Sequence, residues 1–175
     1  MKSEAIVELG KPLQTIETET PEPKGNEVLL KITHSGVCHS DVHIHDGYFD
    51  LGGGNKLPVG AMLNLPHTMG HEIEGEVVSI GPEVTDVEIG SHVVAYPWIG
   101  CGECATCKAG DEHYCNAPRQ LGIQLPGGFA DYCIVPDSKY VLDYEGIRPG
   151  LAATYMCSGL TAFGALKKFV NISDD

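Results

Sequence analysis

Four cysteines that lie close together constrain this chain more than any other feature of its sequence. They form two C-x2-C steps followed by a gap of seven residues: Cys101, Cys104, Cys107 and Cys115. A C-x2-C step lets two thiolates point at one ion across a tight turn, and four thiolates complete a closed tetrahedral zinc shell. Because such a shell has no open position for a substrate, the spacing predicts a structural zinc site in a lobe at about residues 98–118.

Two other interpretations of these cysteines are free surface thiols and an iron–sulfur cluster. The segment Met1–Gly10 has two acids, one lysine and no long apolar core, so it does not resemble a secretory signal. We therefore expect a reducing, cytoplasmic compartment, where clustered cysteines serve more often as metal ligands than as disulfides. The spacing also differs from both common ferredoxin patterns, so zinc is the preferred ion for these four ligands. Cys133 stands alone, and we expect it to be a core residue.

Short segments rich in β-forming residues alternate with turns and predict a mostly β fold. The predicted strands cover residues 27–33, 73–80, 91–96, 129–136 and 139–142. Several short strands at this spacing are typical of a barrel or a sandwich.

Two helices are predicted beside these strands, a short one over residues 39–45 and a longer one over residues 151–170. In the longer one, the apolar residues spaced like one helix face are Leu160, Phe163, Leu166 and Val170. Residues 46–66 contain Gly and Pro with few periodic signals, which predicts a loop that serves a site. Residues 171–175 resemble the end of a helix and the start of a linker.

The charge and hydropathy of the chain exclude two classes of partner. The formal net charge is −13, and an acidic surface repels the phosphates of nucleic acids. No stretch approaches the roughly 20 apolar residues of a membrane span, so we expect no membrane partner.

A second group of metal-ligand residues is spread over three distant segments. Cys38, His71 and Cys157 together offer two thiolates and one imidazole, which is the ligand set of a catalytic zinc with an exchangeable fourth position. Spacing alone does not show that the three residues meet. In the alternative interpretation, Cys157 is a small core residue and His71 is a hydrogen-bonded surface group.

These segments together resemble the medium-chain, zinc-dependent alcohol dehydrogenases. The family signature stands here as Gly70-His71-Glu72-Ile73-Glu74-Gly75, and the run Cys38-His39-Ser40-Asp41-Val42-His43 is similar to the first ligand segment of that family. The four cysteines match its structural-zinc lobe, and residues 157–161 match its third ligand segment. The four motifs occur in the family's order and cover nearly the whole chain.

The resemblance implies a role for each matched residue. The catalytic zinc would be held by Cys38, His71 and Cys157. Glu72 would lie beside the metal and approach it during ligand exchange, and Asp41 would orient His71 through its other ring nitrogen.

The resemblance also implies groups that handle the proton, the cofactor and the substrate. Ser40 would accept the alcohol proton and His43 would pass it toward solvent. His39 would face the pyrophosphate of the cofactor and Thr161 its nicotinamide. Trp98 would line the substrate pocket.

For the chain as a whole, the resemblance implies a GroES-like, partly open barrel over residues 1–170, with short helices and a structural-zinc lobe. It implies two zinc ions, NAD or NADP as the cofactor, a small alcohol or aldehyde as the substrate, and a parent enzyme that is a homo-oligomer. The chain has no G-x-G-x-x-G turn between a strand and a helix. We therefore expect it to lack the NAD(P)-binding domain, with residues 171–175 starting the linker to that domain.

Two functions remain open at this point. The first is a zinc-dependent oxidoreductase domain that oxidises alcohols to aldehydes or ketones with NAD(P) when joined to its cofactor domain. The second is a zinc-stabilised binding or structural module with no catalysis of its own.

Overall fold

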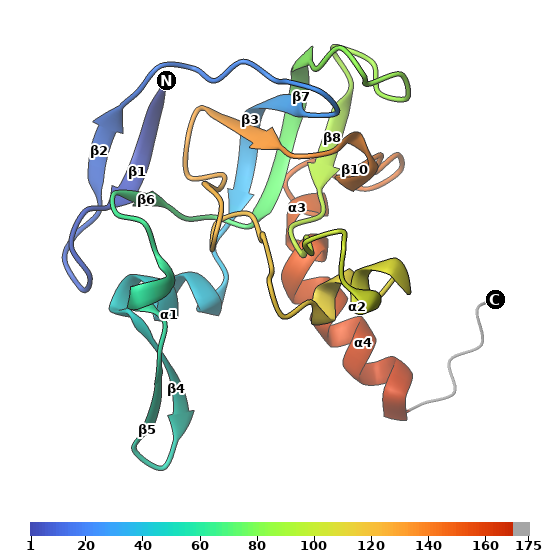
Figure 1. The fold of residues 1–175 in the computed structure, drawn as a ribbon. Helices are drawn as coiled ribbons and strands as arrows, with labels where there is room; N and C mark the ends of the chain where they lie inside the picture. Colours follow the sequence, from blue (N-terminus) through green and yellow to red (C-terminus); the bar gives the residue numbers. More distant parts are fainter. Residues whose placement is uncertain (170–175) are drawn as a thin grey trace.

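The computed structural model describes residues 1–169, and strands make up most of its regular structure (Figure 1). The strands are β1 (Lys2–Ile6), β2 (Gln14–Glu17), β3 (Val28–Gly36), β4 (Tyr48–Gly52), β5 (Asn55–Pro58), β6 (His67–Thr68), β7 (Glu72–Ile80), β8 (His92–Ala95), β9 (Tyr132–Val135) and β10 (Val141–Leu142). The α-helices are α1 (His39–Asp46), α2 (Ala105–Lys108), α3 (Ala152–Thr154) and α4 (Leu160–Phe169). The 3-10 turns are η1 (Gly60–Met62), η2 (Glu112–Tyr114) and η3 (Ser138–Tyr140), and η4 (Tyr155–Gly159) is a π-helix.

A five-stranded sheet with the order β10-β8-β7-β3-β9 forms the centre of the fold, and its strand pairs are antiparallel. Alternate residues of a strand point to opposite faces, and the inward residues of these strands, such as Leu30, Ile73 and Val93, form the main core. A second sheet, β2-β1-β6, lies beside it. No ladder of paired strands within the described residues joins these two sheets into a closed barrel. The predicted mostly β, GroES-like, partly open barrel is therefore confirmed.

The five predicted strands are all present, with shifted ends. The first extends to Gly36, and the fourth shrinks to Tyr132–Val135. Five strands were not predicted: β1, β2 and β6, and the two strands of the hairpin, β4 and β5. The four residues of β2 are mostly exposed, so this strand has no apolar alternation that a sequence pattern would detect.

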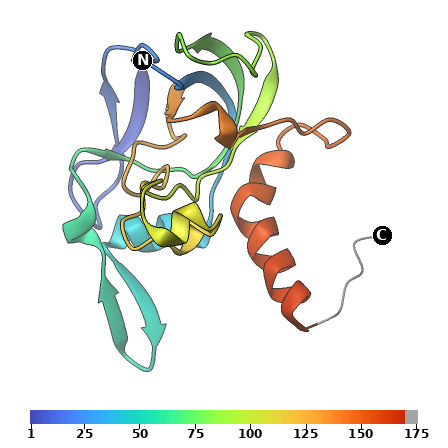
Figure 2. The ribbon, with the colours of Figure 1, turned by 45° about the vertical axis from the view of Figure 1, so that its right-hand side comes forward.

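The prediction of a loop over residues 46–66 is wrong in its middle. That segment contains the β4–β5 hairpin and the turn η1. Its tip is Gly52-Gly53-Gly54, and all three glycines have positive φ angles that only glycine adopts without strain. The hairpin projects away from the sheets (Figure 2), and because most of its residues are exposed it shows no periodic apolar signal.

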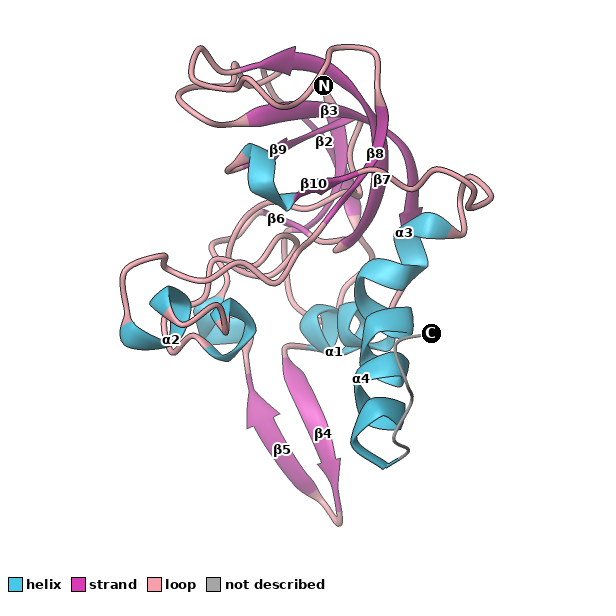
Figure 3. Cartoon of the chain, turned by 90° about the vertical axis from the view of Figure 1, so that its right-hand side faces the viewer, coloured by secondary structure: helices cyan, strands magenta, loops and turns pink. Residues whose placement is uncertain are grey.

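The single predicted C-terminal helix is in fact α3, the π-helix η4 and α4 in succession. Its apolar face is not part of the core, because Leu160, Phe163 and Leu166 are 42%, 51% and 55% exposed. The helix α4 extends from the same end of the molecule as the hairpin (Figure 3). The predicted contribution of Val170 and the predicted linker at residues 171–175 lie outside the described residues.

No helix within residues 1–169 combines the length and the apolar character needed to cross a bilayer.

Candidate metal centres

The four cysteines of the lobe meet around one point. Their sulfur atoms lie 3.9 Å apart between Cys101 and Cys107, 3.5 Å between Cys104 and Cys107, and 3.8 Å between Cys104 and Cys115. A tetrahedral ion with metal–sulfur bonds of about 2.3 Å separates its sulfur ligands by about 3.8 Å. The spacing of the sulfurs therefore fits a closed, four-thiolate metal site.

The backbone of the lobe is arranged to stabilise thiolates. The N–H groups of Cys104 and Cys107 each donate to the sulfur three residues earlier, and those of Cys101 and Ala117 donate to Cys115. The N–H of Cys107 is the main cause that lowers the pKa of Cys104 to about 6. Burial is the main cause that raises the pKa of Cys107 to about 12. The neighbouring sulfurs raise it further, because a second thiolate beside the first lacks a neutralising partner. A divalent cation would supply that partner.

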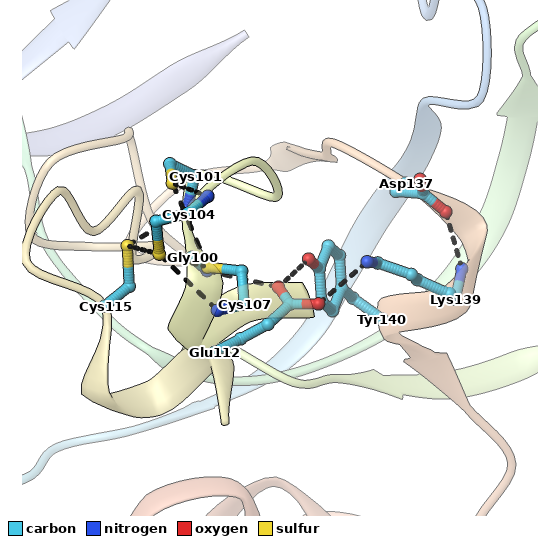
Figure 4. Close-up of polar contacts among 9 residues, drawn as sticks. All are labelled: Gly100, Cys101, Cys104, Cys107, Glu112, Cys115, Asp137, Lys139 and Tyr140. Atoms are coloured by element: carbon cyan, nitrogen blue, oxygen red, sulfur yellow. Dashed lines mark hydrogen bonds and ion pairs between the residues drawn. The ribbon is translucent and has the colours of Figure 1, made fainter. Parts of the chain in front are cut away.

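One carboxylate joins the lobe to the sheet (Figure 4). Glu112 accepts hydrogen bonds from the Tyr140 hydroxyl, from Lys139 Nζ at 2.8 Å and from the Gly100 backbone N–H at 3.3 Å. Burial acts to raise the pKa of Glu112, but Lys139 and Tyr140 hold it below its ordinary value. The lobe is thereby tied to the chain just before β10.

Replacing Glu112 by glutamine is expected to destabilise the metal-loaded protein by about 1 kcal/mol. This is less than a buried charge-assisted hydrogen bond contributes, because Lys139 is half exposed. The free energy of unfolding in urea would measure this. Glu103→Gln is the control, since Glu103 is an exposed acid of the same lobe. Equal stability of E112Q and E103Q would contradict the prediction.

The second predicted ligand group also comes together, although its members come from three elements. Cys38 precedes α1, His71 precedes β7, and Cys157 lies in the π-helix η4. One ligand atom from each lies within 4.8 Å of the others, and the sulfurs of Cys38 and Cys157 are 3.7 Å apart. That distance again matches two thiolates on one tetrahedral ion. The alternative interpretation, in which Cys157 is a core residue with no partner, does not account for this convergence.

Asp41 links the first two of these ligands. Its side chain is 2% exposed, and Oδ2 accepts the backbone N–H of Cys38 at 2.9 Å, which caps the start of α1. The other oxygen, Oδ1, accepts the Gly70 N–H at 3.3 Å and lies 3.2 Å from His71 Nδ1. The geometry therefore gives Asp41 the position from which a carboxylate orients a metal-binding histidine.

His71 has the features of a metal ligand. Its ring is fully buried, and neither ring nitrogen has a hydrogen bond of good geometry within the described residues. Since Nδ1 faces Asp41, Nε2 is the atom left to bind an ion. Burial acts to lower the pKa of His71, but Asp41 and the sulfurs of Cys157 and Cys38 outweigh it and raise that pKa to about 11. The pocket thus stabilises a positive charge, which fits a bound cation.

Glu72 lies next to His71 and contacts the segment that carries the third ligand. Its Oε1 accepts the Ser158 hydroxyl at 2.6 Å and the Ser158 backbone N–H at 2.9 Å. The Glu72 side chain is buried. Ser158 was not identified from the sequence; its position directly after Cys157 was the available signal.

Trp98 lies at the same site. Its Nε1–H donates to the carbonyl of Met156 at 2.9 Å, and its ring meets the His71 ring edge-on, with centroids 5.9 Å apart. Trp98 therefore packs against His71 and the segment that carries Cys157.

The remaining predicted residues lie on the helices around this cluster. Ser40 and His43 are three residues apart on α1 and share a face of it. The His43 ring stacks on that of His39, with centroids 4.7 Å apart, and touches Phe49 of the hairpin. Thr161 is an exposed residue in the first turn of α4.

The partly open β barrel thus carries two clusters that could each hold a metal ion, one of four cysteines and one of two cysteines and a histidine. The family model described as the alcohol dehydrogenase GroES-like domain matches residues 24–145. The chain belongs to this family.

Relatives of this chain are dehydrogenases with different substrates. The chain is 42% identical to the NAD-dependent alcohol dehydrogenase of Saccharolobus solfataricus over 96% of its own length and 48% of the relative's. It is 34% identical to the L-threonine 3-dehydrogenase of Pyrococcus furiosus, over 79% of its length and 38% of the relative's. Because both activities occur among relatives, the family alone does not select the substrate.

Solved structures agree with this assignment. A cobalt- and zinc-bound thermostable alcohol dehydrogenase from Pyrobaculum aerophilum superposes with a TM-score of 0.81 at 31% identity, over 96% of this chain and 48% of that one. The chain spans about half the length of the relatives that it matches.

Proposed function

We propose that this chain is the metal-binding catalytic domain of a zinc-dependent, NAD(P)-linked alcohol dehydrogenase, with two zinc ions per chain. The observation that carries the proposal is the convergence of Cys38, His71 and Cys157 around one point. A closed four-cysteine site serves structure, whereas a site with three protein ligands leaves a position for a substrate oxygen. The zinc- and cobalt-bound relative supports zinc as the ion.

The metal supplies one part of the chemistry, because zinc acts as a Lewis acid and lowers the pKa of an alcohol oxygen. The residues of this chain do the rest. Asp41 holds His71 in place, and the two thiolates offset the charge of the ion. Trp98 forms an apolar wall beside the site, which positions a small alcohol and excludes water.

Removal of the alcohol proton falls to α1 in this proposal. Ser40 would accept the alcohol proton while its own hydroxyl proton passes on toward His43, whose partly exposed ring would release it to solvent. An imidazole suits the outer end of such a relay, because its ordinary pKa lies near neutrality. Glu72, which Ser158 holds beside the ligands, would approach the metal during exchange of its fourth ligand.

The hydride acceptor is NAD or NADP, which takes up the hydride as the alcohol becomes an aldehyde or a ketone. On this chain, the exposed His39 would face the pyrophosphate, and Thr161 at the start of α4 the nicotinamide. His39 begins α1, directly after Cys38, and Thr161 lies four residues after Cys157.

Metal analysis of the purified chain tests this proposal. We expect two zinc ions per wild-type chain and one in Cys157→Ser, because a serine hydroxyl is a poor zinc ligand and the lobe keeps its own ion. Cys133→Ala is the matched control, since Cys133 is an equally buried cysteine in β9 outside both clusters.

One zinc per wild-type chain, with the same value in C157S, would contradict the proposed catalytic site and leave a zinc-stabilised module. An assay of alcohol oxidation with added NAD(P) then separates a domain that catalyses by itself from one that needs its cofactor domain.

A further inference from the structure

Glu74 is a buried acid to which the proposed chemistry assigns no role. Its side chain is 1% exposed, and it lies on β7 three residues after His71. Burying a carboxylate costs free energy unless donors surround it. Three donors do so here: His34 Nδ1 at 3.1 Å, the Tyr144 hydroxyl at 3.1 Å and the Gly150 backbone N–H at 2.8 Å.

The side chain of Glu74 extends from the same face of β7 as that of Glu72, which lies beside the three-ligand cluster. Residues two apart on a strand point to the same face, so Glu74 and Glu72 extend from β7 on one side. Glu72 binds Ser158, and Glu74 binds Gly150. The two carboxylates thus attach both ends of the segment 150–158, which carries Cys157, to the strand that follows His71.

Besides these two carboxylates, the segment is held by α3, which packs against β3, β7 and β8. Ala152 and Ala153 of α3 are buried, and Trp98 binds the carbonyl of Met156. The helix α4 that follows has no buried residue. The π-helix in between, a form that needs support from its surroundings, places Cys157 beside Cys38. The position of Cys157 therefore depends on how firmly the turn at Gly150 is held.

Gly150 is shaped for this attachment. Its φ angle is +81°, a conformation that side chains other than glycine's rarely adopt, and a Cβ there would lie 3.2 Å from the His34 ring. His34 and Glu74 thus enclose the turn from β3 and β7.

We infer that Glu74 is a positioning residue of the three-ligand metal site. Through Gly150 it holds the start of the Cys157 segment against β7, and this sets the distance from Cys157 to Cys38 and His71. The inference rests on the proposed function, since it requires that this cluster bind a metal.

Cobalt exchange on the full chain tests the inference. The apo protein is loaded with two equivalents of Co²⁺, and release to a chelator is followed in the visible ligand-field bands, which report the geometry around the ion. Cys157→Ser, which keeps only the lobe site, identifies the phase that belongs to each site.

In Glu74→Gln we expect release from the three-ligand site to be about tenfold faster, the low end for loss of a group that supports metal ligands. The ligand-field bands of that site should shift, and the lobe phase should keep its wild-type rate. Glu76→Gln is the matched control, because Glu76 is the next residue on the same face of β7 and pairs in register with Lys31 and His92 instead of the Cys157 segment. It should leave both phases unchanged.

Wild-type rate and bands in E74Q, or equal acceleration of both phases, would overturn the positioning role. If E74Q does not fold, Tyr144→Phe removes one of the three donors and should accelerate the same phase to a smaller extent; an unchanged rate there would also overturn it. A wild-type chain that binds no cobalt at the three-ligand site defeats the proposed function itself, which this design detects before any Glu74 variant is compared.

Discussion

Replacing Cys107 by serine is expected to weaken metal binding by the four-cysteine lobe, so that a competing chelator removes its ion, and to lower the melting temperature by about 6–12 °C. Structural zinc sites contribute about 10–16 kcal/mol in small zinc domains, so one thiolate of four accounts for on the order of 3 kcal/mol, or about a hundredfold in affinity. A loss of that size shifts the melting temperature of a chain this long by the stated amount. Metal content per chain and calorimetry measure both effects.

The reason for so large an effect is that the lobe has little else to stabilise it. The helix α2 has four residues and η2 has three, and helices this short do not form by themselves in water. Cys107 is also central to the lobe, since its sulfur lies within 3.9 Å of two other sulfurs and against Gly100.

Cys157→Ser provides the crossed control, because it should remove the other metal and leave the lobe intact. Limited proteolysis should cut C107S within residues 98–118 and spare C157S there. A C107S protein that keeps its full metal content and melts with the wild type would show that the lobe does not need its ion.

Replacing Gly127 by alanine is expected to destabilise the fold by about 3 kcal/mol or more and to weaken the three-ligand metal site as well. A Cβ at this position would lie 2.1 Å from the carbonyl oxygen of Gly70, 2.6 Å from that of Met69 and 2.6 Å from the Cα of Gly122. All three are backbone atoms that cannot rotate away, which places the cost at the upper end of the range for overpacking, about 1–3 kcal/mol or above. Relief of the clash would move Gly70, and with it the adjacent His71.

Gly164→Ala is the matched control for this prediction. Gly164 lies in α4, and a Cβ there would meet nothing within 4 Å. The change should stabilise the protein by up to about 1 kcal/mol, because alanine favours a helix more than glycine does. Urea unfolding curves and metal content distinguish the two variants. Equal stability of G127A and the wild type would show that the backbone at Gly70 yields to the added methyl group.

The sequence predicted those parts of the structure that depend on local spacing. The lobe could be predicted because its four ligands lie within one short segment, where a C-x2-C step limits the geometry. The central strands β3, β7 and β8 could be predicted because β-forming residues cluster there between turn residues, and these strands are largely buried. The β4–β5 hairpin could not, since its residues face solvent and show no periodic apolar signal.

The three-ligand site, in contrast, could not be predicted from local spacing. Composition and spacing named Cys38, His71 and Cys157 as possible ligands, and the family resemblance joined them. Their meeting depends on long-range contacts that no local pattern contains. Asp41 bonds Cys38 and Gly70, and Glu72 and Glu74 bind the Cys157 segment across more than seventy residues of chain.

The amino-acid sequence alone therefore predicted the four-cysteine cluster, the mostly β fold and the identity of the candidate ligands. The tertiary structure decided that the second set of candidate ligands converges, that Glu72 and Glu74 bind the segment that carries Cys157, and that the apolar face of α4 stays outside the core. The physical reason is range: thiolate spacing and strand alternation act over a few residues, whereas buried carboxylates find their donors only after the strands have paired.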